Sequence, residues 1–359
     1  MKRLTAIFIA HALLLAQAAS AAFADDTPAK QLFGAKALPA KMNAQPVGFY
    51  SKGCLAGGVA IPVDGPAWQV MRLSRNRRWG HPDLVRVIED LSQKARRDGW
   101  NGLMVGDMSQ PRGGPMLTGH ASHQIGLDAD IWFMPMPDHR LTYQERENLS
   151  AVSVLKSGSP YVDDGRWTPA HAKLLHEAAS YPQVERILVH PGVKKKLCDT
   201  VRGDRAWLAK IRPYYGHHYH FHLRIKCPDG AANCRPQSPV PAGDGCDRKT
   251  LDWWFEVALA PKKPAKPSTK PEKPKKPRYI RLSDLPSTCA SILDAPDVPA
   301  AAAEYAIRAS AFTAPALDIP KFDPLAILAS KPIEARKPAA ATGLVPAGDI
   351  PVPTPRPSN

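Results

Sequence analysis

The distribution of proline sets the strongest limit on what this chain can fold into. Of the 38 prolines among its 359 residues, half follow residue 260, and residues 261–278 repeat a Lys-Pro theme. Such segments stay extended, because proline favours an extended backbone and the lysine charges repel one another, so they form a spacer and not a core. The region after residue 290 is rich in Ala and Pro and poor in aromatic residues, which predicts a disordered tail over 290–359 with a weak helix over 305–312. The packed domain is therefore expected before residue 260.

The net charge is concentrated in the same spacer. The chain carries 48 Lys and Arg against 33 Asp and Glu, a net charge of +15. An excess of this size is typical of proteins that bind nucleic acids or other polyanions. Residues 261–278 alone contribute a net +7, because they hold seven lysines, one arginine and one glutamate. The rest of the chain is only mildly basic, which weakens this indication. Binding of nucleic acid by the spacer is disfavoured because the chain is predicted to be exported, so an anionic wall polymer is the more plausible contact and nucleic acid is not expected as a partner.

An export signal is predicted at the N-terminus. Lys2 and Arg3 supply the positive start, residues 7–16 form an apolar run too short to span a bilayer, and Ala22-Phe23-Ala24 is a small-x-small cleavage site. The signal peptide is thus residues 1–24, and the mature chain is expected to begin at Asp25 unless the segment is retained as an anchor. No later stretch has the ~18 consecutive apolar residues of a transmembrane helix, so no transmembrane segment is expected in the mature chain.

Six cysteines fit an exported chain. An even number in an oxidising compartment favours disulfides, but six cysteines allow 15 pairings and their spacing does not choose among them. The sequence contains no Cys-x-x-Cys, which argues against a zinc ribbon or a thioredoxin-like site. The cysteines are Cys54, Cys198, Cys227, Cys234, Cys246 and Cys289.

Hydrophobic periodicity predicts an α+β fold. Helices are expected over 82–99 and 168–180, the second with His171 and His176 facing solvent. Short strands are expected over 103–105, 127–133, 184–189 and 219–225. Because helices and strands mix without a βαβ repeat, we expect a small central antiparallel sheet flanked by helices and held by disulfides.

Two histidine clusters carry the candidate chemistry. Six of the 12 histidines lie within residues 119–123 and 217–222. His123 is followed six residues later by Asp130 on an expected strand, so a turn and a strand could bring both side chains to one point. His220 and His222 fall on the same face of the strand over 219–225, because side chains alternate along a strand.

Two imidazoles and one carboxylate with a fourth position open form the ligand set of a catalytic zinc site. We therefore predict His123, Asp130 and His222 as ligands of Zn²⁺. Zinc lowers the pKa of water to near 7 and polarises a carbonyl group, so the implied reaction is hydrolysis of an amide or an ester. The alternative is a histidine cluster that binds metal nonspecifically or is only hydrogen-bonded.

The sequence resembles the penicillin-insensitive murein endopeptidases, which are related to the lysostaphin, D-Ala-D-Ala carboxypeptidase and hedgehog-type zinc metallopeptidases. The resemblance covers roughly residues 45–290. The matching stretches are Gly80–Val85, Gly119–Asp130, His217–Pro228 and Gly243–Cys246.

This resemblance implies roles for individual residues. It makes His123, Asp130 and His222 the zinc ligands and adds His120 as a further group near the metal. It places His217 and His220 beside the metal as catalytic residues. We expect His220, on the strand face of His222, to take the proton or to stabilise the oxyanion, with His217 in support.

The resemblance also implies a substrate, a compartment and a disulfide pairing. The substrate would be cross-linked peptidoglycan, cleaved in the periplasm between D-alanine and meso-diaminopimelate. The pairs would be Cys54–Cys289, Cys198–Cys246 and Cys227–Cys234. The domain over 25–260 would then continue through the spacer to Cys289.

Two other functions fit parts of the sequence. Ser153-Val154-Leu155-Lys156 matches the Ser-x-x-Lys motif of serine D,D-peptidases, and Lys156-Ser157-Gly158 resembles Lys-Thr-Gly. The two motifs share Lys156, although serine enzymes need separate elements, so this function is disfavoured. The second alternative is a non-catalytic zinc-containing module that binds peptidoglycan.

Overall fold

The structure is a computed structural model that describes residues 27–261 and 278–305. The expected signal peptide, most of the Lys/Pro spacer and the tail beyond residue 305, with its expected helix over 305–312, lie outside these residues. None of the helices in these two ranges has the length and hydrophobicity of a membrane-spanning segment.

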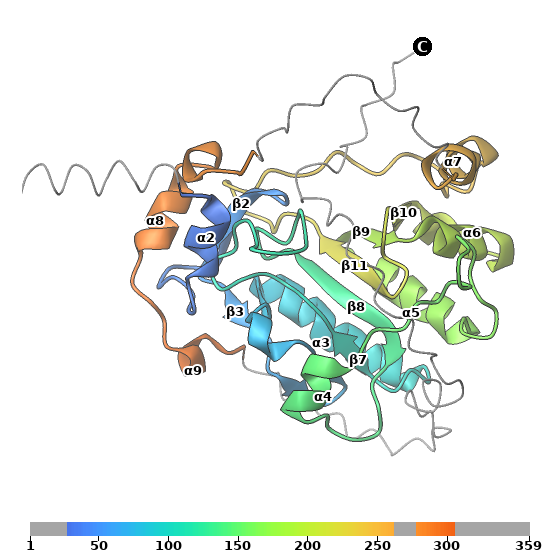
Figure 1. The fold of residues 1–359 in the computed structure, drawn as a ribbon, viewed down its shortest axis with the longest axis horizontal. Coiled ribbons are helices and arrows are strands. Elements are labelled where there is room, and N and C mark those ends of the chain that lie inside the picture. The colour runs from blue at the N-terminus through green and yellow to red at the C-terminus, as the bar shows by residue number, and fades with distance from the viewer. Residues whose placement is uncertain (1–26, 262–277, 306–359) are drawn as a thin grey trace, which may run out of the picture.

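The chain forms the α+β fold that its periodicity predicts (Figure 1). The strands are β1 Gln45–Phe49, β2 Lys52–Ala56, β3 Val59–Ala60, β4 Asp64–Gly65, β5 Trp68–Val70, β6 Trp79–Gly80, β7 Leu103–Val105, β8 Asp128–Pro135, β9 Val184–Val189, β10 Ile211–Pro213 and β11 His220–Ile225. The α-helices are α2 Ala29–Gly34, α3 Pro82–Arg97, α4 Tyr143–Asn148, α5 Pro169–Ser180, α6 Pro191–Thr200, α7 Arg248–Trp253, α8 Thr288–Asp294 and α9 Ala300–Ala303. The short helical turns are η1 Leu73–Arg75, η2 Ala206–Lys210, η3 Trp254–Ala258 and η4 Leu282–Asp284.

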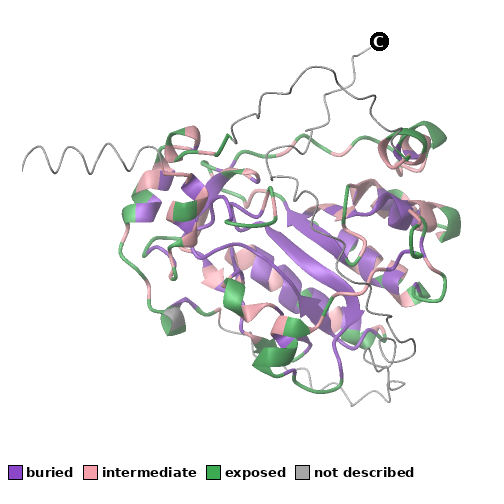
Figure 2. Ribbon diagram, viewed as in Figure 1, coloured by how far each residue is buried: buried purple, intermediate pink, exposed green. Residues whose placement is uncertain are grey.

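The central sheet contains seven strands in the order β10-β9-β11-β8-β7-β5-β4. The inner pairs β9-β11, β11-β8 and β8-β7 are antiparallel, as expected. The pairs β10-β9 and β5-β7 are parallel, so the sheet is larger than expected and is mixed towards its edges. Figure 2 shows that the middle of this sheet is buried.

Side-chain alternation gives β8 and β11 two different faces. Ala129, Ile131, Phe221 and Leu223 point into the main hydrophobic core. Their neighbours in sequence point to the opposite face, where Asp130 of β8 lies directly across from His222 of β11. Because side chains alternate along a strand, the same two strands build the core and present a row of polar groups.

Helices α3 and α5 supply further side chains to the main core. In α3, Leu84, Ile88, Leu91 and Ala95 are buried, which is the spacing expected for one face of a helix. The helix begins after His81, whose Nδ1 accepts a hydrogen bond from the main-chain N–H of Asp83 at 3.2 Å.

The expectation that the histidines of α5 face solvent is wrong. His171 is 5% exposed. Its Nε2 lies 3.1 Å from the carbonyl oxygen of Phe133, and its Nδ1 accepts a hydrogen bond from the main-chain N–H of Thr168 at 3.1 Å. His176 is partly buried, and its ring packs against Trp207. His171 is drawn inward because its position in the first turn lets it both cap α5 and join that helix to β8.

The disorder predicted from residue 290 is wrong for residues 290–305. Ile292 and Leu293 of α8 pack with Phe33 of α2 in a second, smaller core. The buried Arg112 donates a hydrogen bond to the carbonyl oxygen of Leu293 at 2.8 Å, and the main-chain N–H of Tyr305 donates to Ala60. The prediction failed because it rested on the average composition of the segment, in which a few apolar side chains are outnumbered by alanines and prolines.

Three disulfides join distant segments, and they are the pairs that the family resemblance implies. Cys54 of β2 binds Cys289 of α8 across 235 residues of sequence. Cys198 of α6 binds Cys246, and Cys227 binds Cys234 just after β11. The first pair closes a loop that contains the Lys/Pro spacer and fixes α8 against the N-terminal part of the domain.

We expect His171 to make stability depend on pH. Burial lowers the pKa of its imidazole from 6.5 to about 4. Between pH 6.5 and pH 4, the unfolded chain therefore binds a proton at His171 that the folded chain does not bind. This contribution is complete above pH 6.5 and is lost as the pH falls towards 4, by up to about 3 kcal/mol. Urea unfolding at pH 7 and pH 4.5 should therefore show a smaller pH-dependent loss for His171→Gln than for the wild type. His139→Gln, at an exposed position, should behave like the wild type, and an unchanged pH dependence in His171→Gln would contradict the assignment.

Candidate metal centre

Three donor atoms from the predicted ligands form a compact triangle. His123 Nε2 lies 3.1 Å from His222 Nδ1 and 3.4 Å from Asp130 Oδ1. His222 Nδ1 lies 3.3 Å from the same oxygen. Ligands at Zn–N and Zn–O distances of about 2.0–2.2 Å in a tetrahedron are separated by roughly 3.3–3.6 Å. The triangle therefore has close to the dimensions of one face of a tetrahedral zinc site.

The strand register explains why two of these side chains meet. His222 of β11 is the direct cross-strand partner of Asp130 of β8, and both lie on the polar face of the sheet. His123 comes from the loop before β8, where its φ of +66° turns the imidazole towards the strands. Gly126 follows with a φ of +72°, a conformation that costs glycine little, and this turn returns the chain to β8.

Asp128 is a site residue that we did not predict. Its carboxylate accepts hydrogen bonds from the main-chain N–H of His123 at 2.9 Å and from Arg224 Nε at 2.7 Å. Its Oδ1 lies 3.0 Å from His222 Nε2, an ion-pair contact without the alignment of a hydrogen bond. Burial opposes ionisation of Asp128, but Arg224 and His222 hold its pKa well below the usual range. Asp128 thus remains charged and holds two of the candidate ligands.

The Asp130 carboxylate shows that this cluster fits a cation. Its Oδ1 is buried and has no hydrogen-bond partner among the described residues, although imidazole nitrogens of His222, His123 and His220 lie 3.3, 3.4 and 3.5 Å away. Burial opposes ionisation of Asp130, but the neighbouring histidines keep its pKa well below the usual range. A buried charged oxygen without a hydrogen bond is costly, and a metal ion would satisfy it.

His120 lies at the edge of the same cluster. Its Nδ1 is 3.5 Å from Asp130 Oδ2, and donor atoms of His120, His123 and Asp130 all lie within 4.8 Å of one another. Its Nε2 is 2.9 Å from Asp107 Oδ2, which also contacts Arg77. Burial lowers the pKa of His120, but Asp130 and Asp107 together raise it above the usual value. Asp107 orients His120 and was also not predicted.

His217 and His220 lie beside the triangle, as the family resemblance implies. The two rings are 4.9 Å apart, and the ring of His217 is 5.8 Å from that of His222. His217 adopts a φ of +54°. Burial, with repulsion from His222 and His220, lowers the pKa of His217 to about 3. Burial also lowers the pKa of His220.

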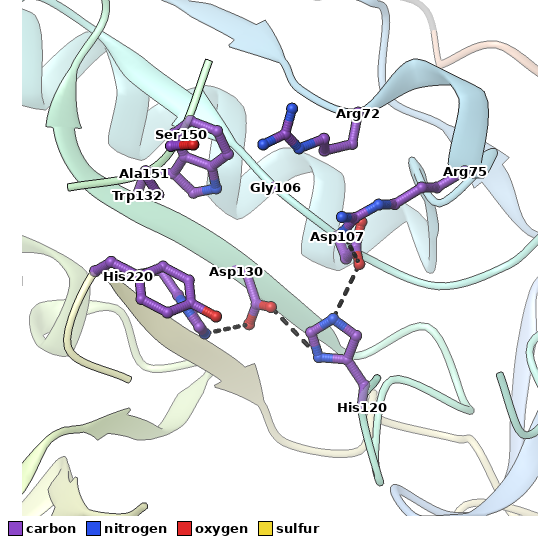
Figure 3. A pocket seen from close by; sticks show the side chains of 11 residues that line it. Arg72, Arg75, Gly106, Asp107, His120, Asp130, Trp132, Ser150, Ala151 and His220 are labelled. Carbon is purple, nitrogen blue, oxygen red and sulfur yellow. Dashed lines mark hydrogen bonds and ion pairs between the residues drawn. The ribbon is translucent and has the colours of Figure 1, made fainter. Parts of the chain in front are cut away.

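A pocket opens onto this cluster, and Figure 3 shows its lining. Its volume is about 260 Å³. Asp130, His120 and His220 lie along one side of it, and Arg72 and Arg75 lie opposite. Binding and catalytic sites are usually concave and carry a few convergent polar groups, and this pocket has both features.

The serine-peptidase motif does not form a matching site. Ser153 Oγ lies 2.9 Å from His218 Nδ1 and accepts a hydrogen bond from the main-chain N–H of Leu155 at 3.1 Å. Lys156 is exposed. The serine therefore contacts a histidine and not the lysine that the motif requires.

Clustered imidazoles and a carboxylate at the side of a pocket are typical of hydrolases that use a metal ion. Residues 46–294 match the family model described as penicillin-insensitive murein endopeptidase. The chain belongs to this family, whose members are peptidases of murein.

Curated relatives with that name align over most of their length. A Haemophilus influenzae protein is 45% identical over 224 residues, which are 62% of this chain and 76% of the relative. A Klebsiella pneumoniae protein is 40% identical over 251 residues, 70% of this chain and 88% of the relative. An Escherichia coli protein is 38% identical over 281 residues, 78% of this chain and 96% of the relative.

The contacts of Asp128 predict a large effect on folding. Asp128→Asn would remove the carboxylate that forms an ion pair with the buried Arg224, and such a change typically lowers the free energy of unfolding by about 3–5 kcal/mol. Urea denaturation of the metal-free protein measures this loss. Asp199→Asn, which removes an exposed partner of Lys195, should change stability by less than about 0.5 kcal/mol. Equal stabilities of the two variants would show that Asp128 does not hold this site together.

Proposed function

We propose that the protein is a zinc-dependent endopeptidase that hydrolyses the D-alanyl to meso-diaminopimelyl cross-link between peptidoglycan stem peptides. The observation that carries this proposal is the convergence of donor atoms from His123, Asp130 and His222 beside a pocket, with His217 and His220 next to them. Family membership supports murein as the substrate.

The zinc ligands in this proposal are His123 Nε2, His222 Nδ1 and Asp130 Oδ1, with His120 as a further group near the metal. When bound, Zn²⁺ would supply a Lewis acid for the scissile carbonyl and would activate water near neutral pH. Asp128 would keep the His222 ring turned so that Nδ1 faces the ligand triangle, since its carboxylate lies against Nε2.

The two remaining histidines would move protons. His217 Nδ1 lies 2.6 Å from the carbonyl oxygen of Tyr215, which can only accept a hydrogen bond, so Nδ1 carries the proton. Because the ring is uncharged at neutral pH, its Nε2 is left as an acceptor. We assign proton transfer or oxyanion stabilisation to His220, which shares the face of β11 with His222, and a supporting role to His217.

We also propose that the protein acts in the periplasm after export through residues 1–24. Three disulfides fit an oxidising compartment. The second candidate function is a zinc-containing module that binds peptidoglycan without cleaving it. The histidines beside the ligand triangle favour the enzyme, because a binding module has no need of them.

Digestion of purified cross-linked muropeptide dimers tests the reaction and the bond. Zinc-loaded protein should convert the dimers to monomers whose masses show one water added between D-alanine and diaminopimelate. A chelator should abolish this conversion, zinc should restore it, and a β-lactam should have no effect. Folded, zinc-loaded protein that leaves the dimers intact would support the binding module, and products of other masses would identify a different bond.

Variants of β11 separate metal binding from catalysis. His222→Ala should lose both bound zinc and activity, because it removes a ligand. His220→Ala should retain one zinc per chain but lower kcat by about 10²–10⁴-fold, the usual contribution of a general acid or base. His139→Ala, at an exposed histidine, should match the wild type in both measurements. Turnover near the wild-type rate in His220→Ala would refute the role of His220.

A further inference from the structure

Arg72 lies across the pocket from the ligand triangle and has no part in the function proposed so far. It lines the pocket together with Arg75, Trp132 and Tyr219 (Figure 3). Arg72 belongs to the segment between β5 and η1, and the residues that follow α4, Ser150 and Ala151, complete this side of the pocket.

The Arg72 guanidinium is held in place by main-chain contacts. Its Nη1 and Nη2 donate hydrogen bonds to the carbonyl oxygens of Arg146 and Leu149, at 3.3 and 2.9 Å. Its Cζ lies 5.8 Å from the ring centroid of Trp132, within the range of a cation–π contact. The residue adopts a φ of +57°, which is uncommon for arginine. A guanidinium has five N–H groups, so several remain for a ligand in the pocket.

Within the described chain, Arg72 forms no ion pair with a carboxylate, and the acidic groups around it are engaged elsewhere. Burial opposes ionisation of Glu147, but its oxygens accept hydrogen bonds from Ser74 N and Oγ at 2.8 and 2.7 Å, and these bonds, with a smaller effect of Arg72 and Arg75, lower its pKa. Asp107 Oδ2 already contacts Arg75, Arg77 and His120 at 2.9–3.0 Å. Arg72 is thus an oriented cation at the pocket, and the half-exposed Arg75 adds a second.

A carboxylate is the group that a guanidinium recognises best, because the two can form parallel hydrogen bonds. In a cross-link to meso-diaminopimelate, the carbon that bears the acylated nitrogen also bears a free carboxylate. That carboxylate is therefore two bonds from the scissile nitrogen. A substrate whose carbonyl group faces the ligand triangle can direct this carboxylate across the pocket.

We propose that Arg72, assisted by Arg75, binds the free diaminopimelyl carboxylate next to the scissile bond. This inference rests on the proposed peptidase function and names the determinant of its specificity. Binding at this position orients the peptide so that its carbonyl faces His222 and His123, and it selects cross-links that keep the carboxylate ionised and unmodified. Amidation of the carboxylate removes its charge and one of its acceptor oxygens.

The test compares two cross-linked muropeptide dimers that differ only in whether this carboxylate is free or amidated. Zinc-loaded wild type should cleave the free acid with a kcat/KM about 10–100-fold higher than the amide, the usual effect of a charge-assisted hydrogen bond. Arg72→Gln should lose about this factor on the free acid and keep the wild-type rate on the amide, so that the ratio falls towards one. Arg72→Lys, which keeps the charge but not the two-pronged donor, should give an intermediate ratio.

The ratio between substrates separates recognition from a structural role, because a damaged fold lowers both rates equally. Arg202→Gln is the matched control, since Arg202 is an exposed arginine that also donates to a main-chain carbonyl, that of Val201. If Arg72→Gln does not fold, the wild-type preference and a reduced ratio in Arg75→Gln decide the question. Equal wild-type rates on both dimers, or an equal loss on both in Arg72→Gln, would overturn the inference. Wild-type protein that cleaves neither dimer would instead overturn the peptidase function on which it rests.

Discussion

The arrangement of the site depends on the hydrogen bonds and ion pairs of the buried Asp128 carboxylate. It accepts hydrogen bonds from Arg224 and from the main chain of His123, and it lies against the His222 ring. One charged group thus connects the loop before β8, strand β8 and strand β11. Because all of these partners are buried, loss of the carboxylate would be felt both in stability and in the orientation of two candidate ligands.

Backbone strain is concentrated around the same site. His123, His217 and Arg72 all have positive φ values, which cost residues other than glycine about 1–3 kcal/mol each. Such conformations persist where the surrounding structure holds them. Here the core beneath β8 and β11, the three disulfides and the packing of α8 against α2 supply that rigidity. The strained conformations hold the side chains of His123 and His217 at the ligand cluster and that of Arg72 at the pocket beside it.

Several features of the site follow from period-two alternation and could be predicted. His220 and His222 share a strand face and Asp130 lies on a strand, as expected, whereas the pairing of these two strands was not predicted. The same rule places Asp128 and Arg224 on that face. It does not predict their ion pair, because the sequence contains many other charged residues with which each could pair. Asp107 lies two residues after the end of β7, yet its contacts with Arg75, Arg77 and His120 join residues that are up to 32 positions away from it in the sequence. Predicted solvent exposure of His171 was wrong because helix periodicity does not reveal which hydrogen bonds a capping residue makes.

The sequence by itself determined which segments alternate as strands, which histidines and carboxylates have the spacing of metal ligands, and where proline prevents a packed core. These are local properties, because propensity and periodicity act over a few residues. Only the tertiary structure decided the cross-strand register that sets Asp130 opposite His222, the ordering of residues 290–305, and the placement of Arg72 across the pocket. Those features arise from contacts between segments far apart in the chain, whose free energy depends on the packing of the whole domain.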